Sequence, residues 1–585
     1  MGKIIRQVVL IVFVLVTVAG CTITDSRTYG GQETAVSFAD LPTKGPLAST
    51  TPAGTQTNTP TPTATATIAP TSTPIPPDLS LDVSDVNLYP IPNIYSGDLV
   101  TFQVLPYVPD TITPENVTVH IIVNDTTIAS SVLSGRNLAG QATGILQWVW
   151  DTTGVVGTQQ VTVILDNDDH LQIGDENPDN NTVSFPITIL DQTDLPDQEQ
   201  NATWIAAETN CCLVHAVTGT AAYRDLPDLL LTVEAAAQQA SDALGATINR
   251  KYDIYFIDRV IGQGGYASSS IVISYLDRQY NGRGLRQVLT HEMVHLLDRQ
   301  FAPQRIIFFA EGLAVWVTGG HYKPENVNER AVALLQMGEY LPLAQLINDF
   351  YLAQHETGYL EAASFIDYLV QRNGWQLFKA FYMDVTADDA PTLAEAVDVN
   401  LQIYYGQTLA AMEQEWLTYL NEQPVMETAV LDLQTTVRYY DVMRDYQLAY
   451  DPTAHFLTAW LPYPDDVQEL GNPADLTRHP QTELNITLET MLLSVDTALR
   501  DGDYERANVL LDSVERVLEQ NGRFVDPLAV SYHDIVLKMI KTGFTPQQIT
   551  LNGETAVVLV TSTRNNNLIK LNLLLRGQEW IILSS

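Results

Sequence analysis

A run of Thr, Pro and Ala residues from Thr50 to Pro77 limits what this chain can fold into. Such a composition buries too little apolar surface to form a core, and its prolines favour an extended polyproline conformation of ~3.1 Å per residue. The sequence therefore predicts a Thr/Pro-rich disordered stalk over residues 22–78. At 585 residues the whole chain is too long for a single core, so roughly two to four domains are expected.

The chain begins with a short apolar leader. Lys3 and Arg6 precede an apolar run from Val8 to Ala19, which is shorter than the ~20 residues of a membrane-spanning helix and has the size of a signal-peptide core. The run leads into Val18-Ala19-Gly20-Cys21, which resembles the lipobox of bacterial lipoproteins. The resemblance implies a signal peptide over residues 1–21, a lipid anchor at Cys21 and a place on the extracytoplasmic face of a bacterial cell membrane. The alternatives are an ordinary signal peptide or a poor membrane helix.

The charge of the chain excludes one class of partner. The formal net charge is −39 and the pI is near 4.3. Because nucleic-acid binding needs a concentration of Lys and Arg, no nucleic-acid partner is expected. The acidity is typical of a protein that stays soluble outside the cell.

The chain has three cysteines, Cys21, Cys211 and Cys212, so a disulfide framework does not hold the fold together. The adjacent pair could close a vicinal disulfide or remain as two free thiols. Because neighbouring side chains on a strand point to opposite faces, free thiols are the favoured interpretation.

From residue 79 to residue 192, short alternating apolar runs are separated by turns. The expected strands are Leu99–Val104, Val117–Val123, Ile145–Trp150, Gln160–Leu165 and Val183–Leu190. This spacing is typical of an all-β, Ig-like sandwich of about a hundred residues. The segment 174–182, before the last strand, resembles adhesion-type Ig-like modules of bacterial surface proteins, which implies a cell-wall or surface partner.

Several carboxylates lie near the end of this module, at Asp166, Asp168, Asp169, Asp175 and Asp179. Carboxylate oxygens are the ligands that calcium prefers, so they could form a calcium site. Such residues more often make polar hairpin turns, which is the favoured interpretation.

Residues 200–424 have a mixed α/β pattern. A helix is expected at Leu226–Leu244 and strands at Tyr252–Ile257 and Tyr266–Ser274. Apolar residues then recur at helical spacing between Leu285 and Leu297, which predicts a second helix.

The second helix carries His291-Glu292-Met293-Val294-His295. Positions i and i+4 of a helix lie one above the other, so both imidazoles can bind one zinc ion. Glu292 is close enough to accept a proton from a zinc-bound water, whose pKa zinc lowers towards ~7. These are the mechanics of the H-E-x-x-H metallopeptidase motif, and they predict Zn2+ as the cofactor. The alternative is a pair of surface histidines on a solvated helix.

A hydrolytic zinc site needs a third protein ligand. The metzincin pattern requires a histidine six residues after His295, but Phe301 occupies that position. Glu311 lies in the apolar helical segment Phe308–Trp316, where a buried carboxylate needs a partner such as a metal ion. Glu311 is therefore the expected third ligand.

Glu311-Gly312-Leu313-Ala314 resembles the E-G-[LF]-A that follows H-E-x-x-H in gluzincins, and the short loop before it is similar to their peptidase MA-like branch. The resemblance implies an α+β zincin-like metallopeptidase domain, with a small sheet, an active-site helix and a helical lower half. Asp298 and His321 are fallback ligands. The simpler interpretations are a surface His at 321 and, at 298, an Asp that supports a metal ligand or caps the helix.

The segment Tyr359-Leu360-Glu361-Ala362-Ala363-Ser364 resembles the Y-x-x-x-A-S of aminopeptidase-N-like gluzincins. In that group the Tyr hydroxyl donates to the tetrahedral oxyanion, a role that a preorganised donor beside a metal can fill. The alternative for Tyr359 is packing at the start of a helix that runs to Leu369.

In gluzincins an edge strand before the metal-binding helix pairs with substrate, and Tyr266–Ser274 has that place. No G-A-M-E-N motif occurs, so the resemblance does not extend to aminopeptidase specificity, and endo- or exopeptidase action stays open.

Residues 425–585 form an α+β C-terminal domain of unknown role. Helices are expected at Met491–Leu499, Tyr504–Leu518 and Leu528–Ile540, followed by strands at Ala556–Thr561, Leu568–Leu575 and Trp580–Leu583. A small antiparallel sheet against a few helices, like an NTF2-type cone, fits this order.

The chain as a whole is expected to be multidomain and extracellular, with a zinc peptidase that acts on peptide or protein substrates. The alternative is a cell-surface binding or adhesion lipoprotein whose peptidase-like domain is catalytically inactive.

Overall fold

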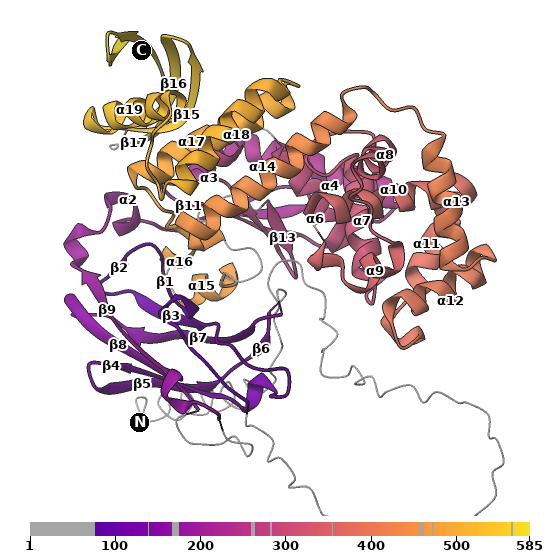
Figure 1. Cartoon of the computed structure of the whole chain (residues 1–585), viewed down its shortest axis with the longest axis horizontal. Helices are drawn as coiled ribbons and strands as arrows, with labels where there is room; N and C mark the ends of the chain where they lie inside the picture. Colours follow the sequence, from indigo (N-terminus) through magenta and orange to yellow (C-terminus); the bar gives the residue numbers. More distant parts are fainter. Residues whose placement is uncertain are drawn as a thin grey trace, which may run out of the picture.

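The computed structural model describes residues 77–137, 140–166, 175–258, 264–280, 284–353, 355–454, 461–470, 473–562 and 565–584 (Figure 1). The predicted signal peptide, Cys21, nearly all of the predicted stalk, Asp168 and Asp169 lie outside these residues. Within these ranges, no helix is long and apolar enough to cross a membrane. The described chain is multidomain, with a β-rich region first and a mixed α/β region after it.

The β-rich region has two sheets around one core, with the strand orders β1-β3-β7-β6 and β2-β9-β8-β4-β5. In β4 every second residue is buried, as expected for a strand with one face on a core. The strands span β1 Val86–Tyr89, β2 Ile94–Tyr95, β3 Leu99–Val104, β4 Thr118–Val123, β5 Thr126–Val132, β6 Gly135–Arg136, β7 Ala142–Asp151, β8 Gly157–Leu165 and β9 Thr182–Leu190. The expected strands are confirmed, and β1, β2, β5 and β6 are additional to them.

The described carboxylates near β9 make turn contacts. Asp175 accepts hydrogen bonds from the backbone N–H of Asn177 (3.0 Å) and from Nδ2 of Asn181 (2.6 Å). These bonds hold the turn before β9, in agreement with the polar-turn interpretation. Among the described residues, no cluster of three metal-ligating side chains includes Asp166 or Asp179.

The mixed region starts with a five-stranded sheet of order β10-β11-β12-β14-β13. Its strands are β10 Trp204–Glu208, β11 Cys212–Val217, β12 Tyr252–Ile257, β13 Gly265–Ala267 and β14 Ile271–Ser274. The expected single strand Tyr266–Ser274 is wrong, because the chain reverses where Ser268 N donates to Ser270 O (2.9 Å). The two halves pair as an antiparallel hairpin, and the short strand β13 forms the end of the sheet.

Helices cover this sheet and extend away from it (Figure 1). They are α3 Ala221–Arg224, α4 Leu226–Leu244, α5 Asp277–Tyr280, α6 Leu285–Asp298, α7 Ile307–Thr318, α8 Val327–Met337, α9 Leu343–Asn348, α10 His355–Asn373, α11 Trp375–Asp384, α12 Leu393–Tyr405 and α13 Leu409–Asn421. The expected helices α4 and α6 are confirmed. Helix α10 begins at His355, so Tyr359 lies one turn inside the helix and not at its start.

Helices α7 and α10 lie in close contact because α7 contains a glycine. A Cβ at Gly312 would lie 2.8 Å from both the carbonyl carbon and the Cβ of Ala362 in α10. Glycine inside a helix costs about 1 kcal/mol relative to alanine, and here the close approach of the two helices accounts for it.

The C-terminal part begins with the long helix α14 (Ala429–Tyr450), which crosses the molecule between the mixed region and the C-terminal sheet (Figure 1). After it come α15 Pro464–Leu470, α16 Ala474–Thr477, α17 Glu483–Arg500, α18 Tyr504–Glu519 and α19 Pro527–Lys541. The antiparallel sheet β15-β16-β17-β18 completes the chain, with β15 Phe544–Asn552, β16 Thr555–Ser562, β17 Asn565–Arg576 and β18 Glu579–Ser584. The expected helices and strands are confirmed, and β15 is additional.

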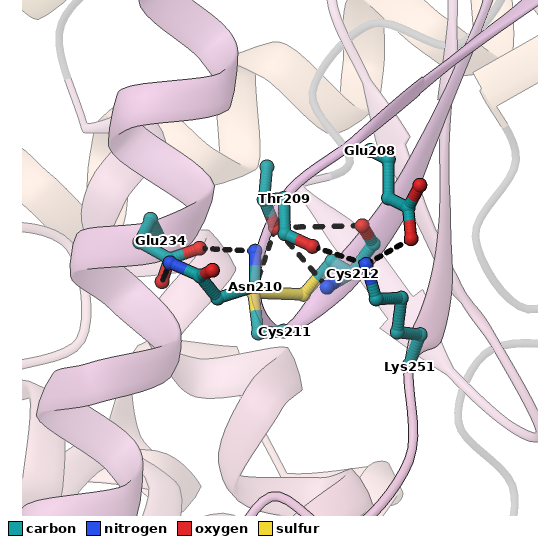
Figure 2. Close-up of a disulfide and its surroundings, with 7 residues drawn as sticks. All are labelled: Glu208, Thr209, Asn210, Cys211, Cys212, Glu234 and Lys251. Atoms are coloured by element: carbon teal, nitrogen blue, oxygen red, sulfur yellow. Dashed lines mark hydrogen bonds and ion pairs between the residues drawn. A yellow bond between two sulfur atoms is a disulfide. The ribbon is translucent and has the colours of Figure 1, made fainter.

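Cys211 and Cys212 form a vicinal disulfide, so the expectation of free thiols is wrong (Figure 2). The strand β11 starts only at Cys212, and Cys211 belongs to the turn before it, so the two side chains do not alternate across a strand. Thr209 N donates to Cys212 O (2.8 Å), and Asn210 Nδ2 donates to Glu234 of α4 (2.9 Å). These bonds fix the turn that brings the sulfur atoms together.

Candidate metal centre

The helix α6 presents both histidines of the H-E-x-x-H motif on one face. Ten of its residues are buried, and they include Glu292 and His295. Because residues four positions apart lie one above the other, the rings of His291 and His295 are neighbours, with centroids 4.8 Å apart.

Helix α7 brings Glu311 to the same point. Its Oε2 atom lies 3.1 Å from His291 Nε2 and 3.2 Å from His295 Nε2. Ligand atoms around a tetrahedral zinc ion with bonds of ~2.0–2.1 Å are roughly 3.3 Å apart. Two imidazoles and one carboxylate are also a donor set that zinc accepts in hydrolytic sites, so these three residues fit the ion.

The electrostatics of two ligands, Glu311 and His295, favour a bound cation. Burial raises the pKa of Glu311, but His295 and His291 outweigh it and hold this pKa well below its usual value, so the carboxylate is ionised. Burial lowers the pKa of His295 to about 4, so its ring is neutral and keeps a lone pair for a metal. Burial also lowers the pKa of His291, but the hydrogen bond to Glu311 and the charge of Glu292 outweigh burial and raise it.

Glu292 lies beside the metal ligands, against the end strand of the sheet. Burial raises its pKa to about 7. A Cβ built on Gly265 of β13 would lie 3.4 Å from Glu292 Cγ, so strand and carboxylate are neighbours. A carboxyl group with a pKa near neutrality is well suited to accept and return a proton.

Two tyrosines lie next to Glu311. Tyr351 donates its hydroxyl hydrogen to Glu311 Oε1 (2.8 Å), and sequence reasoning missed this residue. The ring of Tyr359 lies 6.0 Å from that of His291, centroid to centroid. Burial, with the charges of Glu311 and Glu292, raises the pKa of Tyr359 well above its usual value, so its hydroxyl keeps the proton that a donor needs.

The two fallback ligands lie outside the triad. Asp298 pairs with Arg305 (3.0 Å) and accepts a hydrogen bond from Tyr382 (2.6 Å), so it is a buried structural group. His321 is also mostly buried, and the expectation of a surface histidine is wrong. Its Nδ1 lies 2.6 Å from Glu356 Oε2, and its ring stacks on Tyr359 with centroids 4.3 Å apart.

Comparison with known proteins gives weak similarities. No family model matches the chain, and no curated protein matches it. A solved M1 zinc metallopeptidase mutant from Deinococcus radiodurans, bound to a Tyr-Ser-Ala substrate, is 12% identical over 57% of this chain and 74% of that one, with a TM-score of 0.25. An aminopeptidase N family protein from Idiomarina loihiensis is 10% identical over 58% of this chain and 74% of that one, with a TM-score of 0.23.

For the β-rich region, a CARDB domain from Pyrococcus furiosus is 18% identical over 20% of this chain and 95% of that one, with a TM-score of 0.16. All of these scores are below 0.5, so the function of this chain is inferred from the geometry of its site and not from these similarities.

Proposed function

We propose that this protein is a zinc-dependent peptidase of gluzincin type, lipid-anchored at Cys21 on the outer face of a bacterial membrane. The observation that carries the proposal is the convergence of His291, His295 and Glu311 within 4.8 Å of one another, next to the buried Glu292. Zinc, when bound, supplies Lewis-acid polarisation and lowers the pKa of a water molecule.

Residues of the chain would transfer the proton, stabilise the oxyanion and hold the substrate. Glu292 accepts the proton of the attacking water and returns it to the leaving amine, because it lies beside the metal ligands and burial raises the pKa of its carboxyl group. Tyr359 donates a hydrogen bond to the oxyanion that develops on the substrate carbonyl. The strand β13 lies at the end of its sheet beside Glu292, where an extended peptide can add as a further strand. Such backbone pairing holds peptides with little side-chain preference.

The test is metal content together with turnover. Wild-type protein purified after growth in zinc-replete medium should hold zinc and cleave peptides. Glu292→Gln should keep the zinc and lose hydrolysis, because it removes the base and preserves the shape. His295→Ala and Glu311→Ala should bind zinc at least 10-fold more weakly.

Two outcomes would contradict the proposal. If the wild-type protein held less than a tenth of an equivalent of zinc, the peptidase proposal would be wrong. The remaining hypothesis would be a surface-binding lipoprotein whose peptidase-like domain is inactive. Wild-type turnover by Glu292→Gln would remove the role given to that carboxylate.

A further inference from the structure

A second cluster of metal-ligating side chains lies in the C-terminal part, apart from the centre on α6 and α7. Asp451, directly after α14, and Glu489, on α17, are fully buried, and His479, in the segment between α16 and α17, is 4% exposed. Each of the three offers a ligand atom within 4.8 Å of the other two. In the described part of the chain, this cluster and His291, His295 and Glu311 are the two groups with this property.

The gap between His479 and Asp451 fits an ion better than a direct hydrogen bond. Its Nε2 atom lies 2.7 Å from Glu489 Oε1, a contact that fixes the orientation of the ring. Its Nδ1 atom lies 3.8 Å from Asp451 Oδ2, which is too far for a hydrogen bond. Two zinc–ligand bonds of ~2.0–2.2 Å can span that distance.

Asp451 supplies an independent observation. Its Oδ1 atom accepts a hydrogen bond from Thr453 N (3.2 Å), but its Oδ2 atom is buried and has no hydrogen-bond partner among the described residues. An ionised carboxylate oxygen without a partner is costly in a protein interior, and a cation directly in front of it would remove that cost.

The charges of the cluster point the same way. Asp451, Glu489 and Asp258 all interact with His479, and the Oδ1 atom of Asp258 is likewise buried with no hydrogen-bond partner in the described chain. Arg278 of α5, which pairs with Glu489, is the cation that acts on His479. Burial raises the pKa of Asp258 to about 7, so this carboxyl carries only part of a charge near neutrality. Asp451, Glu489 and Arg278 leave a net charge of −1 when the imidazole is neutral, and a cation in front of Asp451 would offset that charge.

We propose that Asp451 and His479, whose ring is held by Glu489, bind a second divalent cation, of the zinc class because the site combines an imidazole with a carboxylate. The site joins the end of α14, the segment before α17 and α17 itself. Through the pair between Arg278 and Glu489 it also reaches α5, in which Arg278 lies seven residues before the first residue of α6. The cation therefore stabilises the docking of the C-terminal part on the mixed region, and it takes no part in hydrolysis.

The test uses the full chain with the first centre disabled by His291→Ala and His295→Ala. This protein is loaded with zinc chloride, desalted, and measured for zinc by mass spectrometry and for unfolding temperature with and without EDTA. We expect about one equivalent of zinc, and a fall of roughly 5 °C or more on chelation, since a ligand that binds the folded state stabilises it.

Two further variants in that background assign the ion to the cluster. His479→Gln and the nearly isosteric Asp451→Asn should each lose the remaining equivalent of zinc and the response to EDTA. His533→Gln, at a histidine of α19 that stacks on Phe524, should keep both. Asp451→Asn retains the shape of the side chain, so its result stands even if His479→Gln fails to fold.

The second site would be overturned if the His291→Ala, His295→Ala protein held less than a tenth of an equivalent of zinc and its unfolding temperature did not change with EDTA. A protonated His479 would then be the cation that pairs with Asp451 and Glu489. Retention of the ion by Asp451→Asn would also overturn the second site. Neither outcome bears on the first centre, because His291 and His295 are absent from this protein.

Discussion

At the scale of single residues, Glu311 has two tyrosine neighbours with different expected roles. Tyr359→Phe should lower kcat and kcat/KM together by about 100-fold, with KM and zinc content nearly unchanged, because an oxyanion donor acts mainly in the transition state. Tyr351→Phe is the matched control. It removes the hydrogen bond to Glu311 Oε1, so it should weaken zinc binding by up to about 10-fold and leave zinc-saturated kcat within a few-fold.

Steady-state kinetics at saturating zinc, with zinc titrations of both variants, separates the two roles. A rise in KM alone for Tyr359→Phe would assign its hydroxyl to substrate binding. Activity within a few-fold of wild type would leave Tyr359 as a packing residue.

The residues that sequence could predict are those whose spacing is local. His291, Glu292 and His295 follow from the period of one helix, and Glu311 follows from an acid in an apolar helical segment. Tyr351 carries no such signal, because it lies in a short 3-10 turn and reaches Glu311 only through the tertiary fold. The same holds for His321, whose contacts with Glu356 and Tyr359 come from packing between separate segments.

At the scale of elements, the contact between α7 and α10 depends on Gly312. Gly312→Ala should lower the free energy of unfolding by about 1–3 kcal/mol, because the new Cβ would lie 2.8 Å from the α10 backbone and force the helices apart. Intrinsic helix propensity alone would predict a gain of about 1 kcal/mol. Gly358→Ala on α10 is the control, since its nearest neighbour would be 3.4 Å away, and it should be neutral or stabilising. Denaturant unfolding that shows no loss for Gly312→Ala would mean that the helices adjust freely.

Elements were predicted well where one pattern held for a whole segment, as in the helical spacing of α4 and the mostly apolar run of β12. The hairpin of β13 and β14 was missed because Ser268, Ser269 and Ser270 interrupt an apolar run without a glycine or proline. The vicinal disulfide was missed for a related reason. Side-chain alternation applies inside a strand, and β11 begins between the two cysteines.

At the scale of the whole molecule, the apolar leader over residues 1–21 predicts that the protein is anchored to the membrane through Cys21. Cys21→Ala should release the protein from the membrane fraction or leave its precursor unprocessed, because lipidation and cleavage both require that cysteine. Metabolic labelling with a clickable fatty acid, followed by fractionation, measures this directly. Label on the Cys21→Ala protein would contradict the lipid anchor.

Arg478, the first residue after α16, forms an ion pair that joins the C-terminal part to the β-rich region. Its guanidinium makes two bonds to Asp98 of the sandwich (2.5 and 3.0 Å) and one to Glu199 (2.8 Å). The Arg478 side chain is 4% exposed and that of Asp98 is 9% exposed, so solvent screens the pair little. Nothing in the local sequence pattern predicts this contact, because its partners are 380 residues apart.

Arg478→Met should therefore uncouple the sandwich by leaving Asp98 buried without its cation, a change that costs about 3–5 kcal/mol. In calorimetry we expect the β-rich region to unfold in a separate transition at lower temperature, and limited proteolysis should cut between this region and β10.

Arg438→Met is the matched control. Arg438 also pairs with two carboxylates, Asp512 and Glu515, but its side chain is 30% exposed, so its loss should cost about 0–1 kcal/mol. Equal effects of the two variants would mean that the β-rich region is held by its other contacts, among them the hydrogen bond from Trp148 to Asp475, and that Arg478 contributes no more than a surface ion pair.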